Sequence, residues 1–219
     1  PRYRPQRVAV PDGARRRYFA SALAVLIAFA AFGVFSALAG TFLAGTLHHP
    51  SRALAGVTVF AVFAAGVVAQ SASADWSLRR LLATGMTTML TGLSLVVIAA
   101  WLSTPSLDLF VAGGALTGAG AGALFKGALG TVVSVAPEDG RAEALAGLFL
   151  GGYIGLAVPI IGVGVSLQFT TPRVALLAFA VVAAVADHAA ASNTFVAPPS
   201  AKTRETKLTD ASCPSEGTS

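Results

Sequence analysis

The chain has 219 residues, of which 55% are hydrophobic and only 11% are charged, and its formal net charge is +5. A typical soluble domain carries about 25% charged residues, whereas residues 18–51 and 144–172 of this chain carry none. Such stretches would present bare apolar area to water, so the composition excludes a soluble domain. It predicts an all-α transmembrane helix bundle whose surroundings are the lipid bilayer.

Six segments approach or exceed the roughly 20 apolar residues that a helix needs to cross a bilayer. They are residues 18–47, 53–74, 81–101, 109–136, 144–168 and 174–195. The first is long enough to tilt or to contain a break, and the last is interrupted by Asp187 and His188. The turns between segments are short, so consecutive helices are predicted to be antiparallel neighbours.

The basic residues near the helix ends predict the orientation. If the N-terminus is cytoplasmic, twelve of the 15 basic residues lie inside, Arg52 and Arg173 lie outside, and Lys126 lies within the membrane. None of the basic residues forms a stripe along a domain face, so no nucleic-acid partner is expected. We predict a multi-pass protein of the plasma (inner) membrane with both termini cytoplasmic.

The two flanking segments differ from the apolar core in composition. Residues 1–17 are basic and proline-containing, and are interpreted as a cytoplasmic linker before the six-helix domain at 18–195. Residues 196–219 are polar and are predicted to form a disordered cytoplasmic tail. The chain opens on Pro1 rather than methionine, from which we expect an N-terminal portion to be missing.

Small residues recur on the fourth and fifth segments. Gly114, Gly118 and Gly122 are spaced by four residues, and Gly151 and Gly155 repeat this spacing before Pro159. A stripe without side chains lets two helix backbones approach closely. This pattern predicts either tight helix packing or a hinge at a moving interface, and Pro159 favours the second because it frees a carbonyl in mid-helix.

Lys126 and Asp187 are the ionisable residues that fall within apolar segments. Lys126 lies roughly 25 Å along the fourth segment, where its ammonium either extends to the headgroups or faces a water-filled transport path. Asp187 either pairs with Lys126 or marks the end of a short sixth helix. His188 is interpreted as an interfacial histidine.

Aromatic and hydroxyl side chains supply further candidates for a transport path. Phe29, Phe32 and Phe35 lie near one face of the first segment together with Ser36, where they either line the path or pack against neighbours. Tyr153 lies among the glycines of the fifth segment, and its hydroxyl needs a polar partner at that depth.

Enzyme motifs are absent from the sequence. It contains no phosphate-binding glycine loop with lysine, no HExxH or GxSxG motif, and a single cysteine, Cys213. We therefore expect no enzymatic activity, no catalytic residues, no metal and no cofactor.

A basic segment, six helices with short turns, and the connection Asp75…Arg79-Arg80 together resemble the C-terminal half of a major facilitator superfamily transporter. Residues 66–85 occupy the place of the family's G-x-x-x-D-R-x-G-R-R loop motif, with Trp76 departing from it. The resemblance implies a gating role for Asp75, Arg79 and Arg80. The bland alternative is a solvated loop that caps the adjoining helices.

Residues 118–127 and 152–159 are similar to helices ten and eleven of bacterial drug-efflux-like members, and the likeness extends over about residues 15–190. It implies that the first, second, fourth and fifth segments line a central cavity, and that six further helices precede them. The leading hypothesis is a proton-coupled exporter of a small-molecule substrate. The alternative is a complete six-helix membrane protein with a structural or subunit role.

Overall fold

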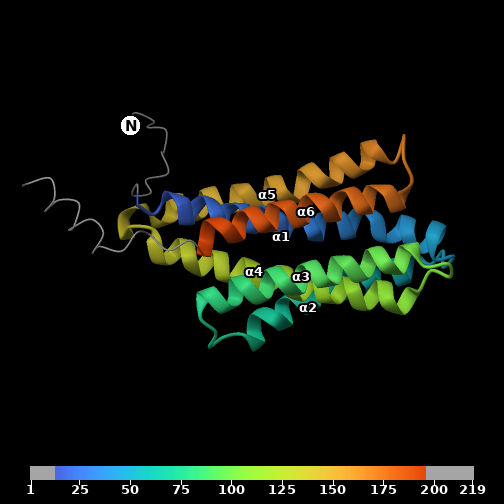
Figure 1. Cartoon of the computed structure of the whole chain (residues 1–219), viewed down its shortest axis with the longest axis horizontal. Helices are drawn as coiled ribbons and strands as arrows, with labels where there is room; N and C mark the ends of the chain where they lie inside the picture. Colours follow the sequence, from blue (N-terminus) through green and yellow to red (C-terminus); the bar gives the residue numbers. More distant parts are fainter. Residues whose placement is uncertain (1–12, 196–219) are drawn as a thin grey trace, which may run out of the picture.

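The computed structural model describes residues 13–195 and contains six long helices (Figure 1). They are α1 (Arg15–Thr41), α2 (Arg52–Ala72), α3 (Leu78–Trp101), α4 (Leu107–Val135), α5 (Arg141–Ser166) and α6 (Pro172–Phe195), with a π-helical turn η1 (Phe42–Thr46) and a 3-10 turn η2 (Glu138–Gly140). All six are long and apolar enough to cross a membrane. The predicted transmembrane bundle is therefore confirmed, and α1 begins at Arg15, three residues earlier than expected.

Three serines explain where α2, α3 and α4 begin. The hydroxyl oxygens of Ser51, Ser77 and Ser106 accept hydrogen bonds from backbone N–H groups three residues later, at 3.2, 3.4 and 3.3 Å. Such N-caps satisfy donors that the first helical turn leaves unpaired. They start α2, α3 and α4 directly after the turns that the sequence indicates.

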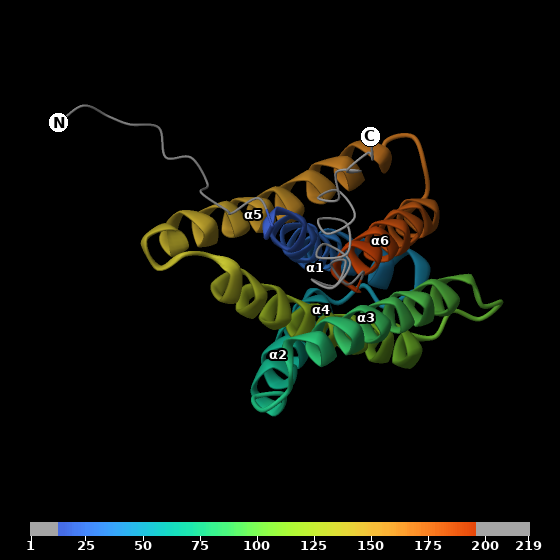
Figure 2. The same ribbon diagram turned by 60° about the vertical axis from the view of Figure 1, so that its left-hand side comes forward.

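The helices form two groups in space, and each group combines two helices from one half of the sequence with the first helix of the other half. Figure 1 and Figure 2 both show α5, α6 and α1 on one side and α2, α3 and α4 on the other. The most extensive packing is between α3 and α4, α1 and α5, and α2 and α4, while α1 and α4 join the two groups. The first and fourth helices are consequently the central ones.

Glycines bring α4 close to both of its neighbours. A Cβ at Gly118 would overlap the carbonyl oxygen of Val62, and a Cβ at Gly122 would overlap the backbone of Gly66, so this stripe packs on α2. On another side of α4, a Cβ at Gly120 would overlap the backbone of Met89 in α3. Only glycine permits backbones to approach this closely.

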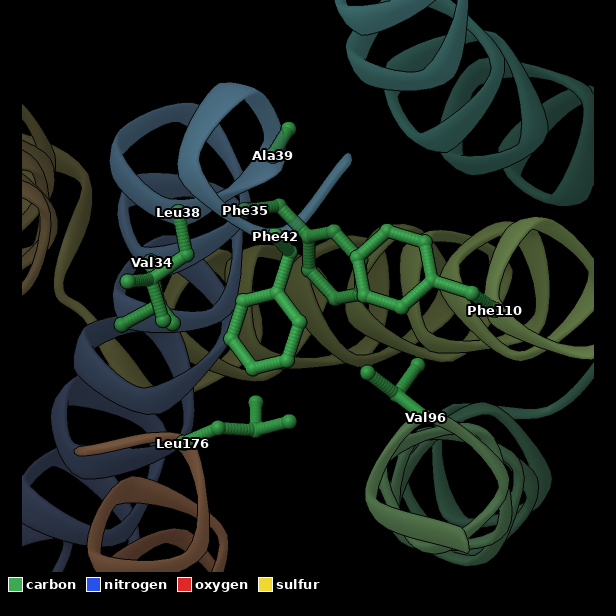
Figure 3. A pocket seen from close by; sticks show the side chains of 8 residues that line it. All are labelled: Val34, Phe35, Leu38, Ala39, Phe42, Val96, Phe110 and Leu176. Carbon is green, nitrogen blue, oxygen red and sulfur yellow. The ribbon is translucent and has the colours of Figure 1, made fainter. Parts of the chain in front are cut away.

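Aromatic rings fill the interior where α1, α3, α4 and α6 meet (Figure 3). Phe42 and Phe110 stack with centroids 5.6 Å apart, and Phe35 lies 6.0 Å from Phe110. The cavity left between the side chains is only about 10 Å³, and the rest of its lining is Val34, Leu38, Ala39, Val96 and Leu176. This space is apolar and barely the size of one water molecule, so this region is core and not a binding site.

Both described ends of the chain lie at one end of the bundle, on the left in Figure 1. The α2–α3 and α4–α5 connections lie at that same end, so Arg79, Arg80 and Arg141 are grouped with the start of α1. Arg52 and Arg173 begin α2 and α6 at the opposite end. Successive connections therefore alternate between the two ends of the bundle, as short turns between antiparallel helices require.

Candidate functional site

One face of the bundle combines side chains from α1, α2, α4 and α5. Phe32 of α1 stacks on Phe63 of α2, with ring centroids 4.5 Å apart. Ser36, one turn further along α1, is exposed, and its hydroxyl donates to the Phe32 carbonyl at 2.9 Å. The predicted pair Phe32 and Ser36 therefore occupies the side of α1 that other helices leave partly open.

A second set of rings continues this face across α4 to α5. Phe125 lies 5.5 Å from Phe29 and 6.1 Å from Phe149, measured between ring centroids. We call Phe29, Phe32, Phe63, Phe125 and Phe149 together the aromatic face. No pattern in the sequence singles out Phe63, Phe125 or Phe149, because only the packing of four helices places these rings together.

Tyr153 follows Phe149 by one turn of α5 and is 65% exposed. Its hydroxyl has no protein hydrogen bond within residues 13–195. A tyrosine in this position offers a polar tip beside the aromatic face. The tip is available to a ligand or to another protein surface.

Lys126 is half-buried between α4 and α2. Its ammonium donates a hydrogen bond to the Gln70 carbonyl oxygen at 2.5 Å. Lys126 follows Gly122 by one turn on the stripe that packs against α2. A charged donor within a membrane-spanning segment is costly unless it has such a partner, so in this conformation Lys126 links α4 to α2.

Asp187 differs from both alternatives that the sequence suggested. It is 1% exposed, and neither carboxyl oxygen has a hydrogen-bond partner in the described part of the chain. The expected pairing with Lys126 is wrong, because that ammonium is bound to Gln70 of α2. The expected helix end is also wrong, since α6 continues to Phe195, while the neighbouring His188 is exposed.

The end of α6 lies beside the start of α1. The Arg16 guanidinium donates to the Ser192 carbonyl at 3.2 Å. Ser192 lies five residues beyond Asp187, or roughly 7.5 Å along the helix axis. The buried carboxyl is therefore close to a basic helix end without being paired to it.

The α2–α3 connection is exposed and basic. Asp75 lies in the turn, and the Arg80 guanidinium carbon lies 4.1 Å from the centroid of the Trp76 ring. Arg79 is also exposed. Trp76, which breaks the resemblance to the loop motif, is thus the side chain on which Arg80 rests.

The two glycines of α5 meet α1 unequally. A Cβ at Gly155 would overlap the backbone of Leu26, whereas a Cβ at Gly151 would lie 3.7 Å from the Ala22 carbonyl oxygen, an ordinary contact. Gly114 faces Phe35 and Val62. Pro159 lies within α5, which remains helical through it.

These features define a class of protein: a polytopic helical membrane protein in which α1, α2, α4 and α5 present an aromatic face and few ions. The family model of the Major Facilitator Superfamily matches residues 21–214, which is most of the chain. The chain belongs to this superfamily, and it acts in membrane transport as a transporter of this type. No curated protein and no solved structure matches the chain significantly.

Proposed function

We propose that the protein exports a small aromatic molecule from the cytoplasm in exchange for protons. The proposed coupling to protons rests on Asp187, which is the one charged residue among the buried residues of the described part of the chain. An ionised carboxylate buried without a partner costs several kcal/mol. Release of a proton from Asp187 therefore requires water or a cation to reach it.

The surroundings of Asp187 supply cations but place none on it. The ionisable side chains that α1, α3, α5 and α6 bring to this end are Arg15, Arg16, Arg17, Tyr18, Arg79, Arg80, Arg141, Glu143 and His188. A shift of α1 along α6 brings the Arg16 guanidinium from the Ser192 carbonyl toward Asp187. Proton release is then linked to helix movement, which is what coupled transport needs.

The aromatic face is the proposed surface for the substrate. Its five rings suit a flat apolar molecule by offset or edge-on stacking, and Ser36 and Tyr153 offer hydroxyls beside them. Lys126 becomes available to an anionic group of the substrate when α2 moves and the Gln70 carbonyl releases it. This arrangement favours aromatic substrates that carry a negative charge.

A second six-helix half is the proposed partner across the substrate path. The spans of α2 and α5 are the least buried of the six described, and that of α1 is the most buried. Their large exposed side chains include Phe60 and Val67 of α2 and Val158 and Ile161 of α5. These faces, flanking the aromatic face, are suited to pack against the other half as it rocks.

The coupling is tested by Asp187→Asn, with Asp108→Asn as the matched control because Asp108 is an exposed carboxyl in the first turn of α4. Membrane vesicles that hold the protein expressed from its own gene receive carboxyfluorescein, an anionic aromatic dye, or rhodamine 6G, a cationic one. We expect pH-gradient-driven movement of the anionic dye, which a protonophore abolishes.

Asp187→Asn should lose gradient-driven movement but keep dye exchange in counterflow, because exchange needs no net proton transfer. Asp108→Asn should keep both. Gradient-driven transport at the parental rate in Asp187→Asn would rule out this residue as the proton carrier. Preference for the cationic dye would contradict the proposed substrate charge.

A further inference from the structure

A groove separate from the aromatic face opens between α2, α3 and α4. Its volume is about 160 Å³, enough for several methylene groups of a lipid chain. Side chains along its length include Ala69, Ser73, Trp76, Thr84, Ala119 and Ala123. It extends from the α2–α3 connection, where Trp76 lies, into the membrane-spanning part of α4.

The interior of the groove is chemically apolar despite its hydroxyls. Ser73 donates to the Ala69 carbonyl and Thr84 to the Arg80 carbonyl, each at 2.6 Å. These internal hydrogen bonds use two of the hydroxyl protons. The third hydroxyl side chain of the lining, Thr88, is half-buried and lies among four alanines. The groove therefore offers a polar solute few hydrogen-bonding partners, and most of its lining suits a hydrocarbon chain.

The mouth of the groove is basic and aromatic. Arg80 stacks on Trp76 at 4.1 Å, which uses the face of the guanidinium and leaves its edge N–H groups for an acceptor such as phosphate. Arg79 is the next residue, so two arginines face one exposed carboxylate, Asp75, and the mouth carries a net positive charge. A tryptophan at the end of a membrane span is typical of the headgroup level.

We propose that this groove binds an anionic phospholipid, with its phosphate at Arg80 and one acyl chain between α2 and α3. The basic mouth matches the anionic headgroup, and the apolar lining below it matches an acyl chain. The two parts of the groove therefore follow each other in the same order as the two parts of a lipid. The bound lipid holds the α2–α3 connection against α4. The site therefore ties the transporter's conformation to the lipid composition of its membrane.

The two tryptophans of the chain, Trp76 and Trp101, allow a direct test. In the Trp101→Phe variant, Trp76 is the sole reporter, and the full chain is reconstituted with phosphatidylglycerol or phosphatidylcholine whose acyl chains carry bromine, a contact quencher. One arginine near the membrane surface raises the affinity for an anionic lipid by about fivefold. We expect brominated phosphatidylglycerol to quench Trp76 at about fivefold lower mole fraction than brominated phosphatidylcholine.

Arg80→Gln should abolish this preference, whereas Arg80→Lys should keep most of it. Arg52→Gln, which removes a charge at the opposite end, should leave it unchanged. In the Trp76→Phe variant, Trp101 should show no preference. Ala119→Leu, which fills the groove, should weaken quenching by both lipids.

Equal quenching of Trp76 by the two lipids would overturn the proposal. So would a preference that survives Arg80→Gln in a protein that remains monodisperse and helical. Excess glycerol 3-phosphate in solution should not displace the lipid. If it did, the site would bind a free phosphate compound and the lipid assignment would be wrong.

Discussion

Lys126 is an ionisable residue within a membrane span that has a structural contact and, in our proposal, a role in transport. Its ammonium donates to the Gln70 carbonyl, a charge-assisted bond of the stronger kind. The bond crosses from α4 to α2, the pair whose glycine stripe lets the two backbones touch. The bond stabilises the conformation described here, and our proposal requires that it break when α2 moves away from α4.

Lys126→Met removes both the hydrogen bond and the cost of an ammonium in the membrane. Since these terms oppose each other, we expect the free energy of unfolding to change by less than about 1 kcal/mol. Membrane insertion should be normal. The loss of one contact to an anionic substrate, about 1.4 kcal/mol, should lower its affinity about tenfold.

Dye-binding titrations and vesicle transport measure this effect, and Arg173→Met at the opposite end of the bundle is the matched control. Transport and affinity at the parental level in Lys126→Met would remove the residue from the substrate path. Its bond to Gln70 would then be purely structural.

At the scale of helices, glycines decide which pairs can approach and how closely. The interface between α1 and α5 offers an internal comparison, because Gly151 and Gly155 lie one turn apart on the same helix. Only Gly155 contacts the opposing backbone so tightly that a methyl group cannot fit. The two positions share helix propensity and differ in packing.

Gly155→Ala should destabilise the protein by about 1–3 kcal/mol because α5 must move away from Leu26. Gly151→Ala gains the same helix propensity of about 1 kcal/mol without a clash, so it should be neutral or stabilising. Thermal aggregation in detergent compares the two. A Gly155→Ala variant as stable as Gly151→Ala would show that the α1–α5 interface yields easily.

At the scale of the whole molecule, the two halves of the sequence exchange their first helices. The first helix of the N-terminal half, α1, packs with α5 and α6, and the first helix of the C-terminal half, α4, packs with α2 and α3. The α1–α2, α3–α4 and α5–α6 turns lie at one end of the bundle, and the described chain ends lie at the other (Figure 1). Arginines are concentrated at the latter end. From the positive-inside rule we expect this end to face the cytoplasm.

Cysteine labelling tests this orientation. Cys213 is the single native cysteine, and Ser103 is exposed in the α3–α4 turn. In intact cells, a membrane-impermeant maleimide should label Ser103→Cys in a Cys213→Ser background, and should leave native Cys213 unlabelled until the cells are permeabilised. The reverse pattern would invert the topology and the direction proposed for export.

The sequence by itself determined the number of membrane spans and their approximate bounds, and each helix begins one to three residues before the predicted segment. Bilayer thickness and the cost of ions in hydrocarbon act on each segment separately, and Ser51, Ser77 and Ser106 cap helices through bonds three residues away. Such local effects can be read without knowing which helices are neighbours.

Only the tertiary structure decided which side chains meet. Asp187 is buried because of how α6 packs, Lys126 finds Gln70 at 56 positions' separation, and Phe63 joins Phe32 through the placement of α2 on α4. Within lipid, apolar helices of similar composition differ little in solvent preference, so close packing and a few hydrogen bonds choose the partners. The residues that make these contacts lie far apart in the chain, so no periodic pattern in the sequence predicts that they meet.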